Sequence, residues 1–171
     1  VAVDAPQHRW LVTDQPTRRL IRSIVNPVRL GQMGETHLLV EPHWQAHFAQ
    51  RLALESGVPL TVGKLREWID QPRPMGLPVE LQNLVILTFA AQTNRRFVLN
   101  GGPYEPEIDR LPDDVELREQ SLPSSADWEV AVSRAGSLFG LVTAQTLNAA
   151  NVGKFVADVK HAVTEKRPAM A

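Results

Sequence analysis

Two histidines four residues apart form the sharpest chemical spacing in this sequence of 171 residues. On a helix, His43 and His47 would share one face, where two imidazoles can bind the same metal ion. Trp44 stands where a zinc protease has the glutamate after its first histidine, and His37, the nearest third ligand, falls in a different predicted element. We therefore interpret the pair as a solvated polar stripe beside a core face, and expect no metal.

Acidic residues are concentrated in one stretch near the middle of the chain, and paired carboxylates can serve as general acid and base or bind a cation. They are Glu105, Glu107, Asp109, Asp113, Asp114 and Glu116. Their spacing lacks the alternating oxygen ligands of a calcium loop, and Pro106 and Pro112 interrupt it. We interpret this stretch as a solvated acidic loop.

The motifs of nucleotide binding and nucleophilic catalysis are missing from the sequence. It contains no Gly-x-x-x-x-Gly-Lys-Ser/Thr string to cradle phosphates, no Gly-x-Ser-x-Gly elbow and no cysteine. Gly31 and Gly34 alone are too weak a signal for a phosphate loop. We expect no catalytic residue, no cofactor site and no enzymatic activity from this chain by itself.

The charges balance in total but are unevenly distributed. Lys and Arg number 18 and Asp and Glu 19, a net charge of −1, which removes the simplest argument for a nucleic-acid or membrane-surface protein. Residues 1–30 nevertheless hold five arginines against two aspartates, whereas residues 101–130 hold two arginines against nine acids. The candidate contacts to nucleic acid or a partner protein are Arg18, Arg19, Arg22, Arg95 and Arg96. The alternative is an exposed helix face with surface ion pairs.

The elements that must position these residues are short, because 13 prolines punctuate the chain. Apolar periodicity predicts helices over 17–25, 42–56, 62–70 and 78–94, and a C-terminal pair within 124–166. Trp44 and Phe48 belong to the apolar stripe of the second of these helices, and the predicted N-caps are Thr61, Ser124 and Asn148. Strand-like segments follow at 37–40, 95–100 and 115–120, with a turn signal at Asn100-Gly101-Gly102. About a dozen residues separate the last two strands.

Three helices followed by a β-hairpin is the order of a winged helix-turn-helix. We predict a mainly α fold with a small β-hairpin, in which a winged-helix-like core at about 43–120 is followed by two C-terminal helices. Residues 1–16 are expected to be a linker or extended segment, 17–166 a single domain and 167–171 a tail. No apolar run is long enough to span a membrane.

The winged-helix order alone does not predict DNA binding. The helix at 78–94 would be the recognition helix, yet it is apolar nearly all round its middle and its polar residues carry little positive charge. These polar residues are Gln82, Asn83, Gln92 and Asn94. The wing beside it is acidic and would repel the phosphate backbone.

Several extended strings resemble a region of the PglY-type phage-resistance ATPases of phage growth limitation and type 2 BREX systems. The resemblance spans roughly residues 17–160. The strings are TVGKLREWID at 61–70, PRPMGLP at 72–78, LVILTFAAQTN at 84–94 and LPDDVELREQ at 111–120, followed by Trp128 and NAANV at 148–152.

This resemblance implies an accessory domain of a cytoplasmic bacterial ATPase whose P-loop lies outside the region, and it carries over no catalytic residue. The partners it implies are other domains of the parent ATPase and other members of the defence system, including a DNA methyltransferase and a phosphatase-like protein. We therefore expect a non-catalytic interaction domain that mediates protein contacts. The alternative is a winged-helix DNA-binding module of the same ATPase.

Overall fold

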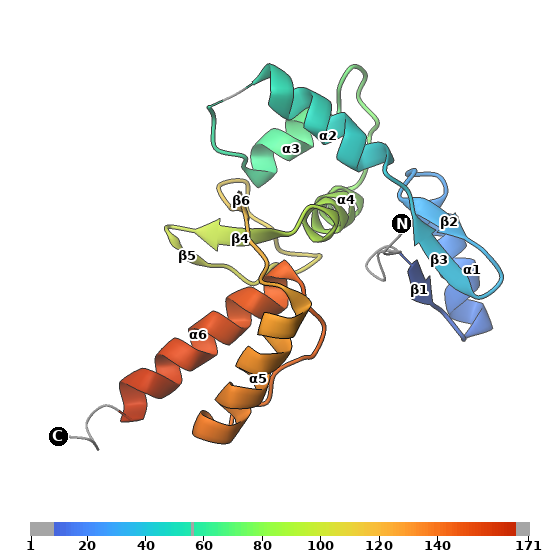
Figure 1. Ribbon diagram of the computed structural model, residues 1–171. Helices are drawn as coiled ribbons and strands as arrows, with labels where there is room; N and C mark the ends of the chain where they lie inside the picture. Colours follow the sequence, from blue (N-terminus) through green and yellow to red (C-terminus); the bar gives the residue numbers. More distant parts are fainter. Residues whose placement is uncertain (1–8, 56, 167–171) are drawn as a thin grey trace. The chain divides into compact units, whose positions relative to one another are not determined.

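A computed structural model describes residues 9–55 and 57–166 (Figure 1). Within these ranges the chain forms six helices and two small antiparallel sheets, which confirms the mainly α fold class. Its contacts divide into two compact units. The first unit comprises Val1–Thr93 and Phe97–Leu117, and the second comprises Asn94–Arg96 and Arg118–Ala171. The single domain predicted over 17–166 includes residues of both units.

The first unit opens with a three-stranded antiparallel sheet in the order β1-β3-β2. Its strands are β1 (Arg9–Leu11), β2 (Gly31–Met33) and β3 (His37–Val40), and the helix α1 (Gln15–Val25) connects β1 to β2. A Cβ atom at Gly31 would lie 2.2 Å from the Leu39 carbonyl oxygen, so only glycine permits this close strand approach.

Residues 9–16 are the part of the expected linker or extended segment that the structure describes. Arg9–Leu11 pairs with β3, and α1 begins at Gln15. Three residues are too few to show a strand period, so pairing with a distant partner decides this element. Residues 1–8, and the predicted tail at 167–171, lie outside the described residues.

Three further helices complete the α part of the first unit: α2 (His43–Leu54), α3 (Val62–Ile69) and α4 (Val79–Gln92). Their bounds lie within two residues of the predicted ones. Thr61 caps α3 as expected, because its hydroxyl accepts a hydrogen bond from the Lys64 amide at 3.2 Å.

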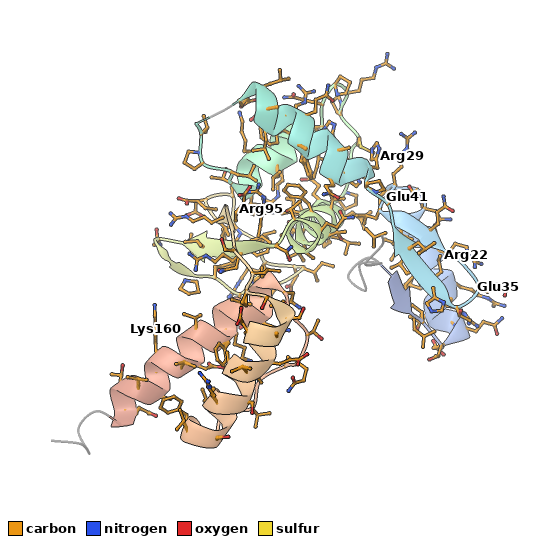
Figure 2. The ribbon with its side chains drawn as sticks, viewed as in Figure 1. Arg22, Arg29, Glu35, Glu41, Arg95 and Lys160 are labelled. Atoms are coloured by element: carbon orange, nitrogen blue, oxygen red, sulfur yellow. The ribbon has the colours of Figure 1, made fainter. Side chains whose placement is uncertain are left out.

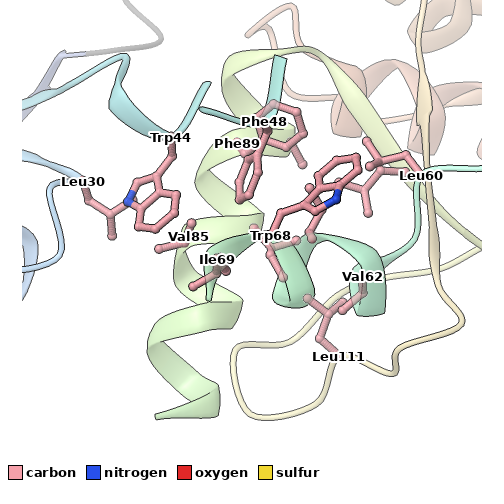
Figure 3. Close-up of a cluster of buried hydrophobic side chains, with 14 of the residues drawn as sticks. Leu30, Trp44, Phe48, Leu60, Val62, Trp68, Ile69, Val85, Phe89 and Leu111 are labelled. Carbon is pink, nitrogen blue, oxygen red and sulfur yellow. The ribbon is translucent and has the colours of Figure 1, made fainter. Parts of the chain in front are cut away.

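Aromatic side chains form the centre of the core of this unit (Figure 3). The Phe48 ring is fully buried, and its centroid lies 4.9 Å from that of Phe89 and 6.5 Å from that of Trp68. Trp44 lies beside it and donates from Nε1 to the Val28 carbonyl oxygen at 2.7 Å. The segment before α2 and the three helices thus share one core.

The second sheet has the order β5-β4-β6. Its strands are β4 (Arg95–Leu99), β5 (Gly102–Pro103) and β6 (Glu116–Glu119). Asn100 and Gly101 have φ of 52° and 80°, the two positive values that a type I′ hairpin turn requires. The hairpin partner of β4 is therefore β5, whereas the predicted partner near 115–120 pairs with the other edge of β4.

Two helices make up most of the second unit: α5 (Ser125–Phe139) and α6 (Ala149–Lys166). The Ser124 hydroxyl caps α5, and Asn148 Oδ1 accepts from the Asn151 amide at 2.8 Å at the start of α6, both as expected. Their small core holds Trp128, Val132 and Val152. Among the described residues, no helix is long and apolar enough to cross a membrane.

Candidate functional site

Three of the five candidate arginines lie together on α1. Arg18, Arg19 and Arg22 are separated by helical spacing, so they project from one side of the helix. The start of α1 is fixed by Asp14, whose Oδ2 accepts from the Thr17 hydroxyl at 2.5 Å and from the Thr17 amide at 2.8 Å. These two hydrogen bonds lower the pKa of the Asp14 carboxyl, so the cap stays ionised at neutral pH.

An open hollow of about 280 Å³ lies over this side of α1. It is lined by Gln15, Arg18, Arg19, Arg22 and Glu35, and we call it the arginine hollow. Arg22 and Glu35 can be followed in Figure 2. Because its guanidinium groups are cationic hydrogen-bond donors, the arginine hollow can bind anionic groups.

Arg22 is held in place by the strand that follows α1. Its Nε and Nη2 donate to the Met33 carbonyl oxygen at 3.3 and 3.2 Å, and Nη2 also donates to the Gly34 carbonyl oxygen at 3.2 Å. These bonds orient the guanidinium group at one wall of the hollow. Sequence periodicity placed Arg22 on an exposed helix face but could not reveal its backbone partners.

The other two candidate arginines are not part of this hollow. Arg95 Nη2 forms an ion pair with Glu119 Oε1 at 2.7 Å, and Arg96 is exposed. Both belong to the second unit, whereas α1 belongs to the first. Three of the five predicted contact residues thus line one hollow within the first unit.

The polar side chains of α4 are engaged within the chain. Asn83 is fully buried, Gln82 Nε2 donates to the Leu77 carbonyl oxygen at 2.9 Å, and Gln92 Nε2 donates to the Glu41 carbonyl oxygen at 3.2 Å. None of these amides is therefore presented to an outside ligand as a recognition helix would present it.

An apolar groove of about 260 Å³ separates α4 from the N-terminal segment. Its walls are Val25, Leu30, Leu38 and Val40 on one side and Leu84, Leu87, Thr88 and Ala91 on the other. One side of α4 therefore faces the N-terminal sheet and its flanking residues. The sequence did not predict this, because residues 25–40 and 84–91 are far apart along the chain.

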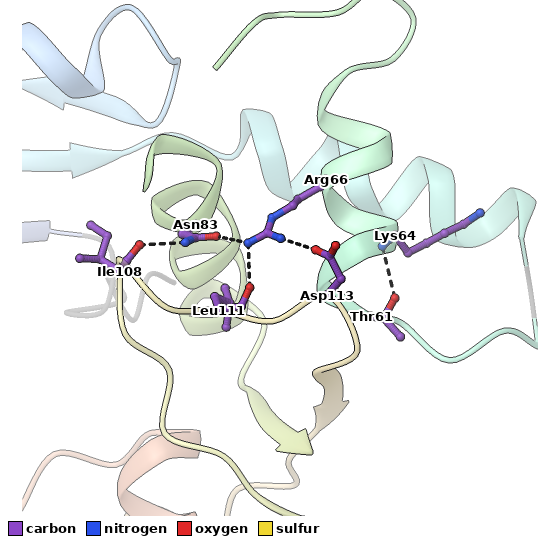
Figure 4. A network of polar contacts seen from close by, with 7 residues as sticks. All are labelled: Thr61, Lys64, Arg66, Asn83, Ile108, Leu111 and Asp113. Carbon is purple, nitrogen blue, oxygen red and sulfur yellow. Dashed lines mark hydrogen bonds and ion pairs between the residues drawn. The ribbon is translucent and has the colours of Figure 1, made fainter. Parts of the chain in front are cut away.

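Arg66 and Asn83 tie the acidic loop to α3 and α4 (Figure 4). Arg66 was not among the predicted residues, and Asn83 was predicted only as a polar residue of a candidate recognition helix. Arg66 Nη1 pairs with Asp113, while its Nη2 donates to Asn83 Oδ1 and to the Leu111 carbonyl oxygen, each at 2.7 Å. Asn83 Nδ2 donates to the Ile108 carbonyl oxygen at 2.8 Å. An asparagine inside the apolar run of α4 was the signal that could have found this network.

The two histidines of the predicted pair, His43 and His47, are both in contact with other parts of the fold. His47 Nε2 lies 2.8 Å from the Trp68 carbonyl oxygen, so one ring nitrogen is used inside the fold. Partial burial lowers the pKa of His43, with smaller contributions from Arg29 and His47, which favours the neutral ring. In residues 9–55 and 57–166, no three His, Cys, Asp or Glu side chains are grouped to hold a metal ion.

Residues 1–90 match the family described as the BREX System ATPase PglY protein 5th domain. The matched part contains the N-terminal sheet, α1, α2, α3 and most of α4, so the arginine hollow lies inside it. The acidic loop, Arg95, Arg96 and both C-terminal helices lie beyond it. No solved structure matches the chain. Because the match covers more than half of its 171 residues, the chain belongs to the family of the fifth domain of the BREX system ATPase PglY.

Proposed function

We propose that this chain is a non-catalytic accessory domain of a PglY-type ATPase and that it acts through protein contacts. ATP hydrolysis is assigned to other parts of the parent protein, in the bacterial cytoplasm, and no cofactor is assigned to this domain. The observation that carries the proposal is the engagement of α4: its amide side chains bind within the chain, and one side of it faces the N-terminal segment.

This observation matters because the elements follow the winged-helix order. Backbone hydrogen bonds join the start of α3 to the segment that follows the acidic loop. The Leu117 amide donates to the Leu60 carbonyl oxygen at 2.7 Å, and the Val62 amide donates to the Val115 carbonyl oxygen at 2.9 Å. In winged-helix proteins that read DNA, the helix corresponding to α4 presents polar side chains to the major groove. Here these side chains support the domain itself.

The acidic loop adds an electrostatic argument. It follows the β4–β5 hairpin that would serve as a wing, and its carboxylates would repel a phosphate backbone approaching this region. Arg66 pairs with Asp113 but is also bonded to the Asn83 side chain and the Leu111 carbonyl oxygen. The loop is therefore held as an acidic surface, which suits contacts with a protein better than contacts with DNA.

A winged-helix DNA-binding module remains the second candidate, and the arginine hollow is the observation that favours it. Three guanidinium groups on one helix could contact successive phosphates. Such contacts would bind DNA through α1 and without base readout by α4. The two candidates therefore differ in whether removal of the domain affects protein association or DNA binding by the parent ATPase.

The test compares the intact parent ATPase with a variant in which residues 17–166 are replaced by a flexible Gly/Ser linker. We expect the variant to hydrolyse ATP, to bind duplex DNA as the intact protein does, and to lose co-purification of at least one other member of the defence system. Retention of ATP hydrolysis is the control that the remainder is folded. Unchanged co-purification together with lost DNA binding would establish the second candidate instead.

A further inference from the structure

We propose that the arginine hollow on α1 is a docking site for an acidic segment of a partner protein. This inference rests on the proposed function and specifies the chemistry of one contact. The residues that line the hollow carry three guanidinium groups and one carboxylate, that of Glu35. The nearby Asp14 carboxyl also interacts with the charge of Arg18, and the sum of these charges is still positive. Arginine is the preferred residue for binding carboxylates, because its planar fork of N–H donors matches two oxygens.

The arginines of the hollow have donors to spare. Neither Arg18 nor Arg19 forms an ion pair within the part of the chain that the structure describes. Arg22 uses Nε and Nη2 on backbone carbonyl oxygens, and Nη1 takes no part in these bonds. An incoming carboxylate therefore meets three guanidinium groups without first displacing an internal ion pair.

The hollow is also partly preorganised. Asp14 caps α1, Val25 anchors the other end of the helix in the core, and the Met33 and Gly34 carbonyl oxygens orient Arg22. Ordering flexible side chains is a main cost of binding, and this cost falls when the side chain is already held. Arg22 is thus the oriented wall of the site, and Arg18 and Arg19 are free to adjust to the ligand.

Glu35 and Gln15 favour a polypeptide over a nucleic acid as the ligand. Both line the hollow and can accept hydrogen bonds, and Glu35 is negatively charged. A peptide supplies carboxylates for the arginines and backbone N–H donors for Glu35. The phosphodiester backbone of DNA has acceptors and negative charge but no N–H donor. Its phosphates would therefore be repelled by Glu35, and the Glu35 carboxylate would receive no hydrogen bond in return. The volume of about 280 Å³ also suits a few side chains.

The test measures binding of a fluorescein-labelled peptide of five Asp-Gly repeats to the full 171-residue chain by fluorescence anisotropy. The matched neutral probe is the corresponding Asn-Gly peptide, and a duplex DNA of 20 base pairs is the competing polyanion. We expect the Asp-Gly peptide to bind more tightly than either probe. Its binding should weaken as salt rises from 50 to 300 mM, since salt screens exposed charges.

The deciding variant is Arg18→Gln combined with Arg19→Gln, which leaves Arg22 and its bonds to the sheet intact. We expect it to weaken binding of the acidic peptide at least tenfold. Arg134→Gln is the matched control, because it removes an exposed arginine from the helix α5 and should leave the affinity unchanged. Circular dichroism of each variant checks that its helices are retained.

Three results would overturn the inference: no binding of the acidic peptide, equal loss of binding in the Arg134→Gln control, or tighter binding of the DNA duplex that the double substitution abolishes. The last result would assign the hollow to nucleic acid. Failure here is distinguishable from failure of the proposed function, because replacing residues 17–166 removes every surface of the domain, whereas the double substitution changes the arginine hollow alone.

Discussion

The two units of the chain differ in how they are stabilised. The first encloses Phe48, Trp68 and Phe89 in a continuous core and ties its acidic loop down through Arg66 and Asn83. The second has only a small buried cluster of Trp128, Val132 and Val152, with Leu122, Leu147 and Phe155 partly buried against it. Long-range packing thus dominates the first unit, whereas the second depends on a few contacts between α5 and α6 and on the residues that end these helices.

The largest expected effect comes from removing the ring at the centre of the first unit. Phe48→Ala should lower the free energy of unfolding by about 3–5 kcal/mol, because a large buried side chain leaves a cavity that its neighbours cannot fill. Amide hydrogen exchange with mass spectrometry, which reports each unit separately, should show the loss of protection in α2, α3 and α4.

The matched control for this change is Phe155→Ala in the second unit. Phe155 is only partly buried, with its ring centroid 5.2 Å from that of Trp128, so its removal should cost less and should affect α5 and α6. If both substitutions lowered protection equally across the whole chain, the contrast between the two units would be wrong.

An intermediate effect is expected at the polar network of the first unit. Asn83→Ala leaves the Ile108 carbonyl oxygen and one donor of Arg66 without this partner, which should cost about 1–3 kcal/mol. Hydrogen exchange should also rise in residues 108–113, since the acidic loop loses an anchor. Gln82→Ala, one residue away on α4, removes only a bond to the Leu77 carbonyl oxygen and should leave that loop protected.

The smallest effect is expected for substitutions of two glycines in the helices of the second unit, one at the end of α5 and one inside α6. Gly140 ends α5 with φ of 72°, and a Cβ atom there would meet nothing within 4 Å, so Gly140→Ala adds only conformational strain. We expect a loss of about 1 kcal/mol in urea denaturation. Gly153→Ala, inside α6 and equally open, should instead stabilise by about 0.5–1 kcal/mol. Loss of stability in both variants would contradict this assignment.

Much of the fold could be predicted because its signals are local. Thr61 and Ser124 were predicted caps, the apolar stripe with Trp44 and Phe48 predicted α2, and Asn100-Gly101 predicted the turn after β4. The strands β1, β2 and β5 were missed. Each has two or three residues, too few for a period, and each forms only because a partner strand lies beside it.

The candidate site was predicted in part. The sequence indicated the basic face of α1, because Arg18, Arg19 and Arg22 recur at helical spacing, and it grouped Arg95 and Arg96 with them by charge alone. The structure pairs Arg95 with Glu119 and leaves the α1 arginines to line a hollow. The order of charges along a chain does not show which acidic side chain lies beside each arginine. The ion pair between Arg95 and Glu119 therefore could not be predicted from the sequence.

By itself, the sequence determined the helices, their caps, the acidic loop and the basic face of α1, since each depends on residues within a few turns of one another. Tertiary structure alone decided that α4 lies beside the N-terminal sheet, that Arg66 reaches Asp113 across 47 positions, and that Glu35 joins the arginines of α1. The physical reason is that periodicity and capping act over neighbouring residues, whereas burial, ion pairing and the shape of a site require segments distant in sequence to meet.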